Sequence, residues 1–142
     1  MFAKQLTVFI ENRAGRLSEV LSVLKSSGVN IISMSLADTT EFGLLRLIVN
    51  DAATGKEKLS ENGFSSLLSD VSIIEIEHKV GSLQELLKMI DEKGVNIEYM
   101  YGLSINSDCA YVVLKASDLK HVDDILNQCG IRTLDNDALL RL

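Results

Sequence analysis

The sequence repeats itself at an offset of 66 residues. Residues 15–31 and 81–97 align without gaps, and eight of the seventeen positions are identical. The identities include the Gly that opens each segment and the Gly-Val-Asn-Ile that closes it. A chain made of two copies of one pattern is expected to fold as two similar modules. We therefore predict modules at residues 1–70 and 71–142, each near the lower size limit for a domain that folds alone.

Hydrophobic periodicity predicts the same order of elements in each repeat. Residues 5–11 alternate between apolar and polar, as a half-buried strand does. Apolar residues then follow at i, i+3, i+4 and i+7 from Leu17 and from Leu83, which is the pattern of a helix lying on a core. Gly28 and Gly94 are suited to end these helices, and Ser82 with Glu85 resembles a capping box. Further strands are predicted at 31–38, 44–50, 64–68, 72–77, 97–105, 110–116 and 131–135, turns at 38–41 and 106–108, and helices at 53–62 and 119–128.

This order is strand-helix-strand-strand-helix-strand, twice. It predicts an α+β fold made of two tandem ferredoxin-like βαββαβ modules, with antiparallel sheets paired side by side and helices on one face. Because this fold carries many unrelated functions, particular residues have to decide the function.

Charge and composition exclude several classes of protein. The net charge is −6, with no basic run, so neither nucleic acid nor an anionic membrane is an expected partner. No apolar run approaches the ~20 residues of a membrane-spanning helix. Cys109 and Cys129 lie too far apart for a metal site or a disulfide framework. We expect a cytoplasmic protein with neither a metal nor another cofactor.

Catalytic residues are not evident. His78 follows a predicted strand and His121 lies on a predicted helix, and neither has a neighbouring nucleophile or acid that would form a catalytic group. The sequence therefore predicts no enzyme activity.

The segment that leads into each first helix is the strongest functional signal. Gly15 and Gly81 lie where a strand turns into a helix, and the missing side chain lets a ligand approach the backbone. The first amides of a helix and its dipole favour an anion such as a carboxylate. Taken singly, Gly15 and Gly81 are better explained by a tight turn, and Gly28-Val29-Asn30 by a helix cap.

Together these segments resemble the ACT domain, a small regulatory module attached to amino-acid biosynthetic enzymes and transcription regulators. The family's loop commonly reads Asn/Asp-x-Pro-Gly-x-Leu, and its first helix commonly ends in Gly-Val-Asn-Ile. Here the loops are residues 12–17 and 78–83, and the proline is replaced by Ala14 and by Val80. The resemblance covers nearly the whole chain.

The resemblance implies a free amino acid bound where the loop of one module meets the Gly-Val-Asn-Ile segment of the other, with the two sheets joined into one of eight strands. The first predicted site comprises Asn12, Arg13, Ala14, Gly15, Arg16, Leu17, Asn96 and Ile97. A second, pseudo-symmetric site comprises His78, Lys79, Val80, Gly81, Ser82, Leu83, Val29, Asn30 and Ile31.

We therefore predict a regulatory protein that senses a free amino acid and signals to a partner, such as a metabolic enzyme or regulator. One alternative is a pairing module that binds no ligand and docks on such a partner; the missing prolines favour it. A small enzyme is a further alternative. Residues 31–38 and 44–49 of the predicted strands are apolar on both sides, which predicts a homodimer.

Overall fold

The computed structural model describes residues 1–38, 41–103 and 108–142. The turns predicted at 38–41 and 106–108, and the end of the strand predicted at 97–105, lie partly outside the described residues. The chain forms two compact units. We call Lys4–Ser69 the N-terminal unit, and Asp70–Leu142 together with Met1–Ala3 the C-terminal unit. How far each of the predicted modules folds by itself stays a prediction.

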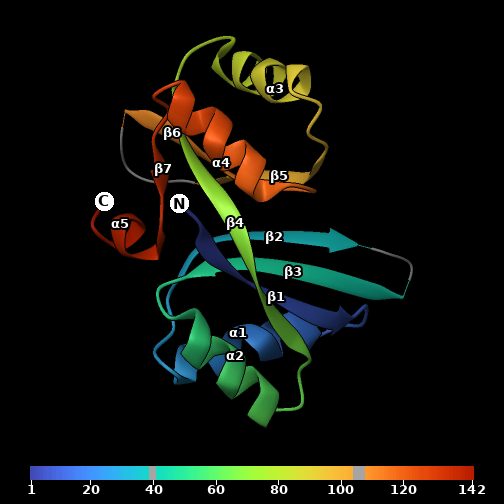
Figure 1. The fold of residues 1–142 in the computed structure, drawn as a ribbon. Helices are drawn as coiled ribbons and strands as arrows, with labels where there is room; N and C mark the ends of the chain where they lie inside the picture. The colour runs from blue at the N-terminus through green and yellow to red at the C-terminus, as the bar shows by residue number, and fades with distance from the viewer. Residues whose placement is uncertain (39–40, 104–107) are drawn as a thin grey trace. The chain divides into compact units, whose positions relative to one another are not determined.

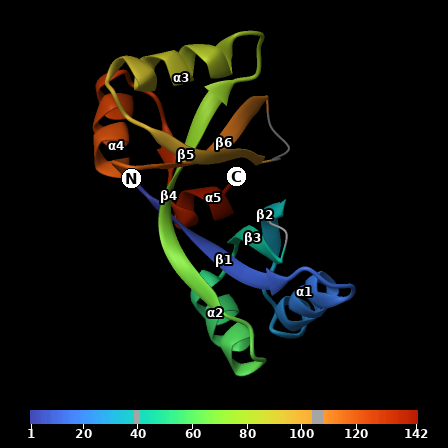
Figure 2. The same ribbon diagram turned by 90° about the vertical axis from the view of Figure 1, so that its right-hand side faces the viewer.

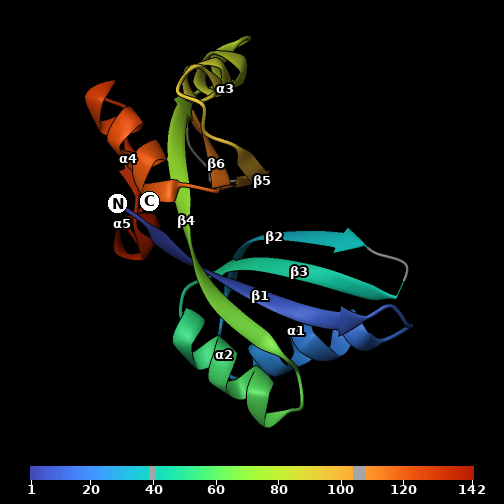
Figure 3. The ribbon, with the colours of Figure 1, turned by 45° about the vertical axis from the view of Figure 1, so that its right-hand side comes forward.

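The N-terminal unit follows the predicted order of elements. Its strands lie in the order β2-β3-β1-β4, and β3 pairs antiparallel with both β1 and β2. Helices α1 and α2 lie on the same side of strands β1, β2 and β3 (Figures 1 and 3). The bounds are β1 (Ala3–Glu11), α1 (Arg16–Ser26), β2 (Ile31–Asp38), β3 (Phe42–Val49), α2 (Ala52–Glu61) and β4 (Ser66–Glu77), of which β4 continues into the C-terminal unit.

The core of the N-terminal unit lies between its helices and its sheet. Every second residue of β1 faces this core, namely Leu6, Val8 and Ile10, and Val20 and Leu24 face it from α1. Helix α1 ends at the predicted glycine: Gly28 has a φ of +71°, and the N–H of Val29 donates to the carbonyl of Leu24 at 2.9 Å. These two features form a left-handed helix termination.

The C-terminal unit repeats this arrangement. Its strands lie in the order β5-β6-β4, with β7 on the other side of β4, and β6 pairs antiparallel with both β4 and β5, as β7 does with β4. Figure 2 shows α3 and α4 packed outside the strands, and their apolar faces share one core with β4 and β6. The bounds are α3 (Ser82–Glu92), β5 (Ile97–Leu103), β6 (Cys109–Ala116), α4 (Leu119–Gln128), β7 (Thr133–Leu134) and α5 (Asn136–Leu140).

The structure corrects the number of strands. The strands predicted at 64–68 and 72–77 are one continuous strand, β4, which is the last strand of the first repeat and the first strand of the second. The described residues therefore hold seven strands instead of the eight that the resemblance implied.

Two helices differ from what the sequence suggests. Helix α2 forms although Gly55 is a poor helix former, because Gly55 is buried against Leu6 and Leu24, where a side chain would be crowded. Helix α5 was not predicted. The carboxylate of Asp135 accepts a hydrogen bond from the N–H of Ala138 at 2.7 Å and thereby caps it.

Candidate functional site

The loop between β1 and α1 has the geometry that the sequence predicts. Gly15 is the residue that caps α1, and its φ of +87° lies in the left-handed region that other residues avoid. No side chain caps the helix there. The loop backbone is held by the N–H of Arg13, which donates to the carbonyl of Glu11 at 2.8 Å. The amino end of α1 is therefore accessible at an exposed loop.

A cavity of about 210 Å³ lies beside this loop within the N-terminal unit. Asn12, Arg13 and Leu17 line it from the predicted site. Strand β2 contributes its last residues, Leu36 to Asp38, and β3 contributes Gly43. Sequence reasoning missed Leu36, Ala37 and Gly43, because the pairing of β3 with both β1 and β2 is what brings the carboxyl end of β2 beside the loop.

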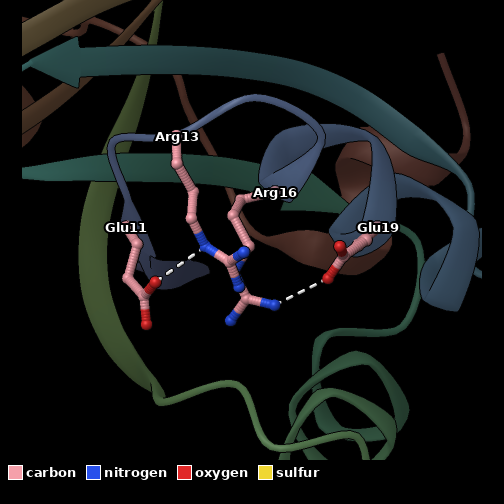
Figure 4. Close-up of polar contacts among 4 residues, drawn as sticks. All are labelled: Glu11, Arg13, Arg16 and Glu19. Atoms are coloured by element: carbon pink, nitrogen blue, oxygen red, sulfur yellow. Dashed lines mark hydrogen bonds and ion pairs between the residues drawn. The ribbon is translucent and has the colours of Figure 1, made fainter.

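Both arginines of this loop form ion pairs with acidic residues of the same unit (Figure 4). The Nε of Arg13 lies 2.8 Å from the Oε2 of Glu11, and the Nη1 of Arg16 lies 2.6 Å from the Oε2 of Glu19. Arg16 also places its guanidinium over the ring of Phe64, 4.4 Å from the ring centroid. Arg13 therefore lies at the cavity, whereas Arg16 packs against Phe64.

The C-terminal unit has the same loop. Gly81 caps α3 with a φ of +89°. A cavity of about 460 Å³ beside it is lined by His78, Lys79, Ser82 and Leu83 of the predicted second site, together with the end of β5 and the start of β6. Val80 and Gly81 are exposed on the loop.

An ion pair stands at the same place in both loops. The Nζ of Lys79 lies 2.6 Å from the Oε2 of Glu77, as Arg13 does beside Glu11. The hydrogen bond from Lys79 lowers the pKa of Glu77 and raises that of Lys79. Both groups therefore carry their charges at neutral pH.

The predicted capping box at Ser82 is wrong. The cap residue is Gly81, and Ser82 is the first residue of α3. Its side chain is buried, and its Oγ has no hydrogen-bond partner among the described residues. Ser82 adopts helical backbone geometry because the left-handed glycine before it already makes the turn.

The Gly-Val-Asn-Ile segments lie at the opposite end of each first helix. Val29, Asn30 and Ile31 line another cavity of about 420 Å³ with residues of α1. Asn96 is exposed and Ile97 opens β5. An eleven-residue helix, of about 16 Å, separates each such segment from the loop of its own unit. Within one unit the structure therefore does not bring the two kinds of predicted site residue together.

Other kinds of site are not apparent in the part of the chain that the structure describes. No group of three or more His, Cys, Asp or Glu there could hold a metal ion. No helix among those residues is long and apolar enough to cross a membrane.

The sequence profile of the family described as "ACT domain pair" matches residues 1–140. The chain belongs to the ACT domain pair family. This confirms the resemblance drawn from the two loops, and it agrees with the repeated βαββαβ order in the structure. A comparison with curated protein sequences gave no significant match.

Solved structures share the fold of this chain. A protein from Bacteroides thetaiotaomicron is 34% identical over 100% of this chain and 98% of its own, with a TM-score of 0.93. The ligand-free regulatory subunit of aspartate kinase from Thermus thermophilus is 15% identical over 88% of this chain and 90% of its own, with a TM-score of 0.64. The corresponding subunit from Thermus flavus is 16% identical over 90% and 93%, with a TM-score of 0.59. The two kinase subunits share the fold of this ACT domain pair.

Proposed function

We propose that this ACT domain pair is a cytoplasmic regulatory protein that binds a free amino acid and does no chemistry on it. The observation that carries the proposal is the left-handed glycine at Gly15 and Gly81, which opens a helix beside a cavity in each unit. The amino end of a helix stabilises a carboxylate through its N–H groups and its dipole. Every free amino acid carries such a carboxylate.

The loop residues bind the amino acid in distinct ways. The backbone amides from Ala14 to Leu17 donate hydrogen bonds to its carboxylate, and Asn12 and Arg13 line the pocket. The same positions of the second loop, residues 78–83, form the second site. Following the family resemblance, Asn96 and Ile97 complete the first site, and Val29, Asn30 and Ile31 complete the second. No cofactor is required, and the bound state is passed to a metabolic enzyme or a regulator.

A thermal-shift experiment with the twenty amino acids tests the proposal. A ligand at ~100 times its Kd adds about 2.7 kcal/mol to the free energy of unfolding, which raises the Tm of a chain of this size by several degrees. We expect one amino acid at millimolar concentration to do so. Asn12→Ala and His78→Ala, at equivalent exposed positions, should each reduce the shift, whereas Lys56→Ala on α2 should not. If no amino acid shifts the Tm, the proposal fails.

A second candidate function is a pairing module that binds no amino acid. Two observations favour it: Arg13 is already paired with Glu11, and Val80, which replaces the family's proline, is an apolar side chain fully exposed at the loop. In that case the amino acids leave the Tm unchanged, and a metabolic enzyme or a regulator from the same cell shifts it instead.

We also propose a homodimer. Phe9 and Phe42 are 41% and 53% exposed, and with Leu44 they lie on the face of β1 and β3 that points away from the N-terminal core. A standard interface buries ~800 Å² per partner, which is enough to cover such a face. Light scattering at micromolar concentration should give twice the 15.6 kDa chain mass, and Phe42→Glu should shift the mass toward 15.6 kDa. A wild-type mass of 15.6 kDa would refute the dimer.

A further inference from the structure

A second cavity of the C-terminal unit, which adjoins the loop cavity and shares Lys79 and Ser82 with it, lies between the end of β4, the first turns of α3 and the segment before β7. Its volume is about 350 Å³. Leu86, Met89 and Ile131 give it an apolar lining, and Ser82 and Glu85 line it from the first turn of α3. It thus combines an apolar surface with the carboxylates of Glu75, Glu77 and Glu85.

The N-terminal unit fills the equivalent place with its own arginine. The guanidinium of Arg16 lies over the Phe64 ring at 4.4 Å and pairs with Glu19 at 2.6 Å. The Arg16 side chain is only 18% exposed, so the arginine is largely enclosed by its own unit. An alkyl chain with a guanidinium thus occupies this position between helix and sheet.

The two repeats align at these positions. Arg16 and Glu19 correspond to Ser82 and Glu85 at the offset of 66 residues. Phe64 corresponds to Ile131 by its hydrogen bonds: the N–H of Phe64 donates to Leu59 and that of Ile131 to Leu126, both at 2.9 Å. The C-terminal unit has therefore kept the carboxylate and lost both the arginine and the aromatic ring.

The residue that stands in place of the arginine is a buried polar group without a partner. Ser82 is 8% exposed, and its Oγ has no hydrogen-bond partner among the described residues. A buried hydroxyl without a partner costs free energy, so this position is not stabilised by its own side chain as it is in the N-terminal unit.

The charges at this cavity favour a cation. Lys79 pairs with Glu77 at 2.6 Å, and Arg132 pairs with Glu75 at 3.2 Å, while Lys79 also interacts with the charge of Glu85. The lining therefore holds three carboxylates and two cations, one negative charge in excess. Glu85 has no arginine at the position where Glu19 has Arg16. A positive group beside Glu85 therefore restores the charge balance of the N-terminal unit.

We infer that this cavity binds a small molecule that carries a guanidinium group on an apolar chain, in the place that Arg16 occupies in the N-terminal unit. The guanidinium pairs with Glu85, while the chain lies against Leu86, Met89 and Ile131. This site goes beyond the proposed carboxylate sites at the loops, because it recognises a cation and needs no helix amide.

The experiment uses n-propylguanidinium as the probe and N-propylurea as its neutral counterpart of the same shape. Both are titrated into the full chain, and the methyl resonances of Met89 and Ile131 are followed by NMR. We expect n-propylguanidinium to shift both resonances. N-propylurea should bind at least about tenfold more weakly, because a charged hydrogen-bonded pair is lost. Equal binding of the two probes, or no shift with either, overturns the inference.

Two variants test the residues. Ser82→Arg supplies the missing arginine from within, and we expect it to abolish binding of n-propylguanidinium and to raise the Tm. Glu85→Gln keeps the cavity and should weaken binding about tenfold, while Glu92→Gln at the far end of α3 should leave the Kd unchanged. Because Glu85 is exposed, Glu85→Gln is expected to fold, so it tests the role of the carboxylate even if Ser82→Arg does not fold.

Retained binding in folded Ser82→Arg, or an unchanged Kd in Glu85→Gln, overturns the inference. The amino-acid panel separates it from the proposed function. A chain that binds n-propylguanidinium but responds to no amino acid other than arginine keeps this inference and loses the other. A chain that responds to an amino acid other than arginine equally in wild type and in Glu85→Gln, and that ignores the probe, does the reverse.

Discussion

Gly55 of α2 faces Leu6 of β1 so closely that a Cβ at Gly55 would lie 3.0 Å from the Cδ2 of Leu6. A Cβ would also lie 3.5 Å from the Cδ2 of Leu24 on α1. The glycine thus allows α2 to approach the core of the N-terminal unit more closely than a residue with a side chain would.

We predict that Gly55→Leu lowers the free energy of unfolding by about 1–3 kcal/mol, because an overpacked core is strained. Lys56→Leu is the matched control: it brings the same side chain to the exposed side of the same helix. Urea unfolding of both variants measures the difference. If the two lose equal stability, the close approach at Gly55 is unimportant.

Arg16 is predicted to stabilise the N-terminal unit through its contact with Phe64. Arg16→Ala should lower the free energy of unfolding by about 1–2 kcal/mol, because the cation–π contact and the packing of the arginine chain are both lost. Arg13→Ala is the control, since its pair with Glu11 is exposed and contributes about 0–1 kcal/mol. Chemical denaturation distinguishes them. An equal effect of both variants would contradict the prediction.

Asp51 is predicted to make the stability of α2 depend on pH. Its carboxylate accepts hydrogen bonds from the Oγ1 of Thr54 at 2.7 Å and from the N–H of Thr54 at 3.1 Å, which lower its pKa below the usual 3.8. The folded state therefore favours the ionised form, so the stabilisation is complete above pH values near 3.8 and is lost as the pH falls through the folded pKa.

Asp51→Asn keeps a good helix cap without an ionisable group. From about pH 5 to 7, above the usual Asp titration range, we expect a constant stability difference between wild type and this variant. At lower pH the wild type should lose stability relative to the variant, because its carboxylate becomes protonated. Thermal unfolding across this range measures it. A difference that does not change with pH would exclude the carboxylate as its source.

Cys109 is predicted to react slowly with thiol reagents. Burial raises its pKa above the usual 9.0, and the neighbouring Glu75, whose Oε1 lies 3.6 Å from the Sγ, raises it further. Since the thiolate is the reactive form, a higher pKa leaves less of it at neutral pH. Cys129 is exposed and should react first.

Stopped-flow labelling with a chromogenic disulfide should therefore show two phases. Cys129→Ser should remove the fast phase, and Glu75→Gln should accelerate the slow one by removing a negative charge beside the sulfur. If Glu75→Gln leaves the slow phase unchanged, burial alone controls the reactivity of Cys109.

The sequence by itself determined the repeat, the order of elements and the two helix-opening loops. Helices α1, α3 and α4 could be read from a period of apolar residues, because a helix is built from contacts between residues close in sequence. Gly15 and Gly81 could be identified for the same reason: a left-handed turn depends on the residue that makes it. Those parts of the candidate site were therefore predictable.

Tertiary structure alone decided the remainder. The segments around Ser66 and Glu77 became one strand because β4 has neighbours in the sheet along its length, which no local pattern encodes. Gly55, a poor helix residue in isolation, is suited to α2 because of Leu6 and Leu24. Arg16 and Phe64 meet through packing between elements distant in the chain, and the equivalent Ser82 is buried with no hydrogen-bond partner for its Oγ in the described part of the chain. Such contacts depend on which elements become neighbours, and only the folded chain fixes this.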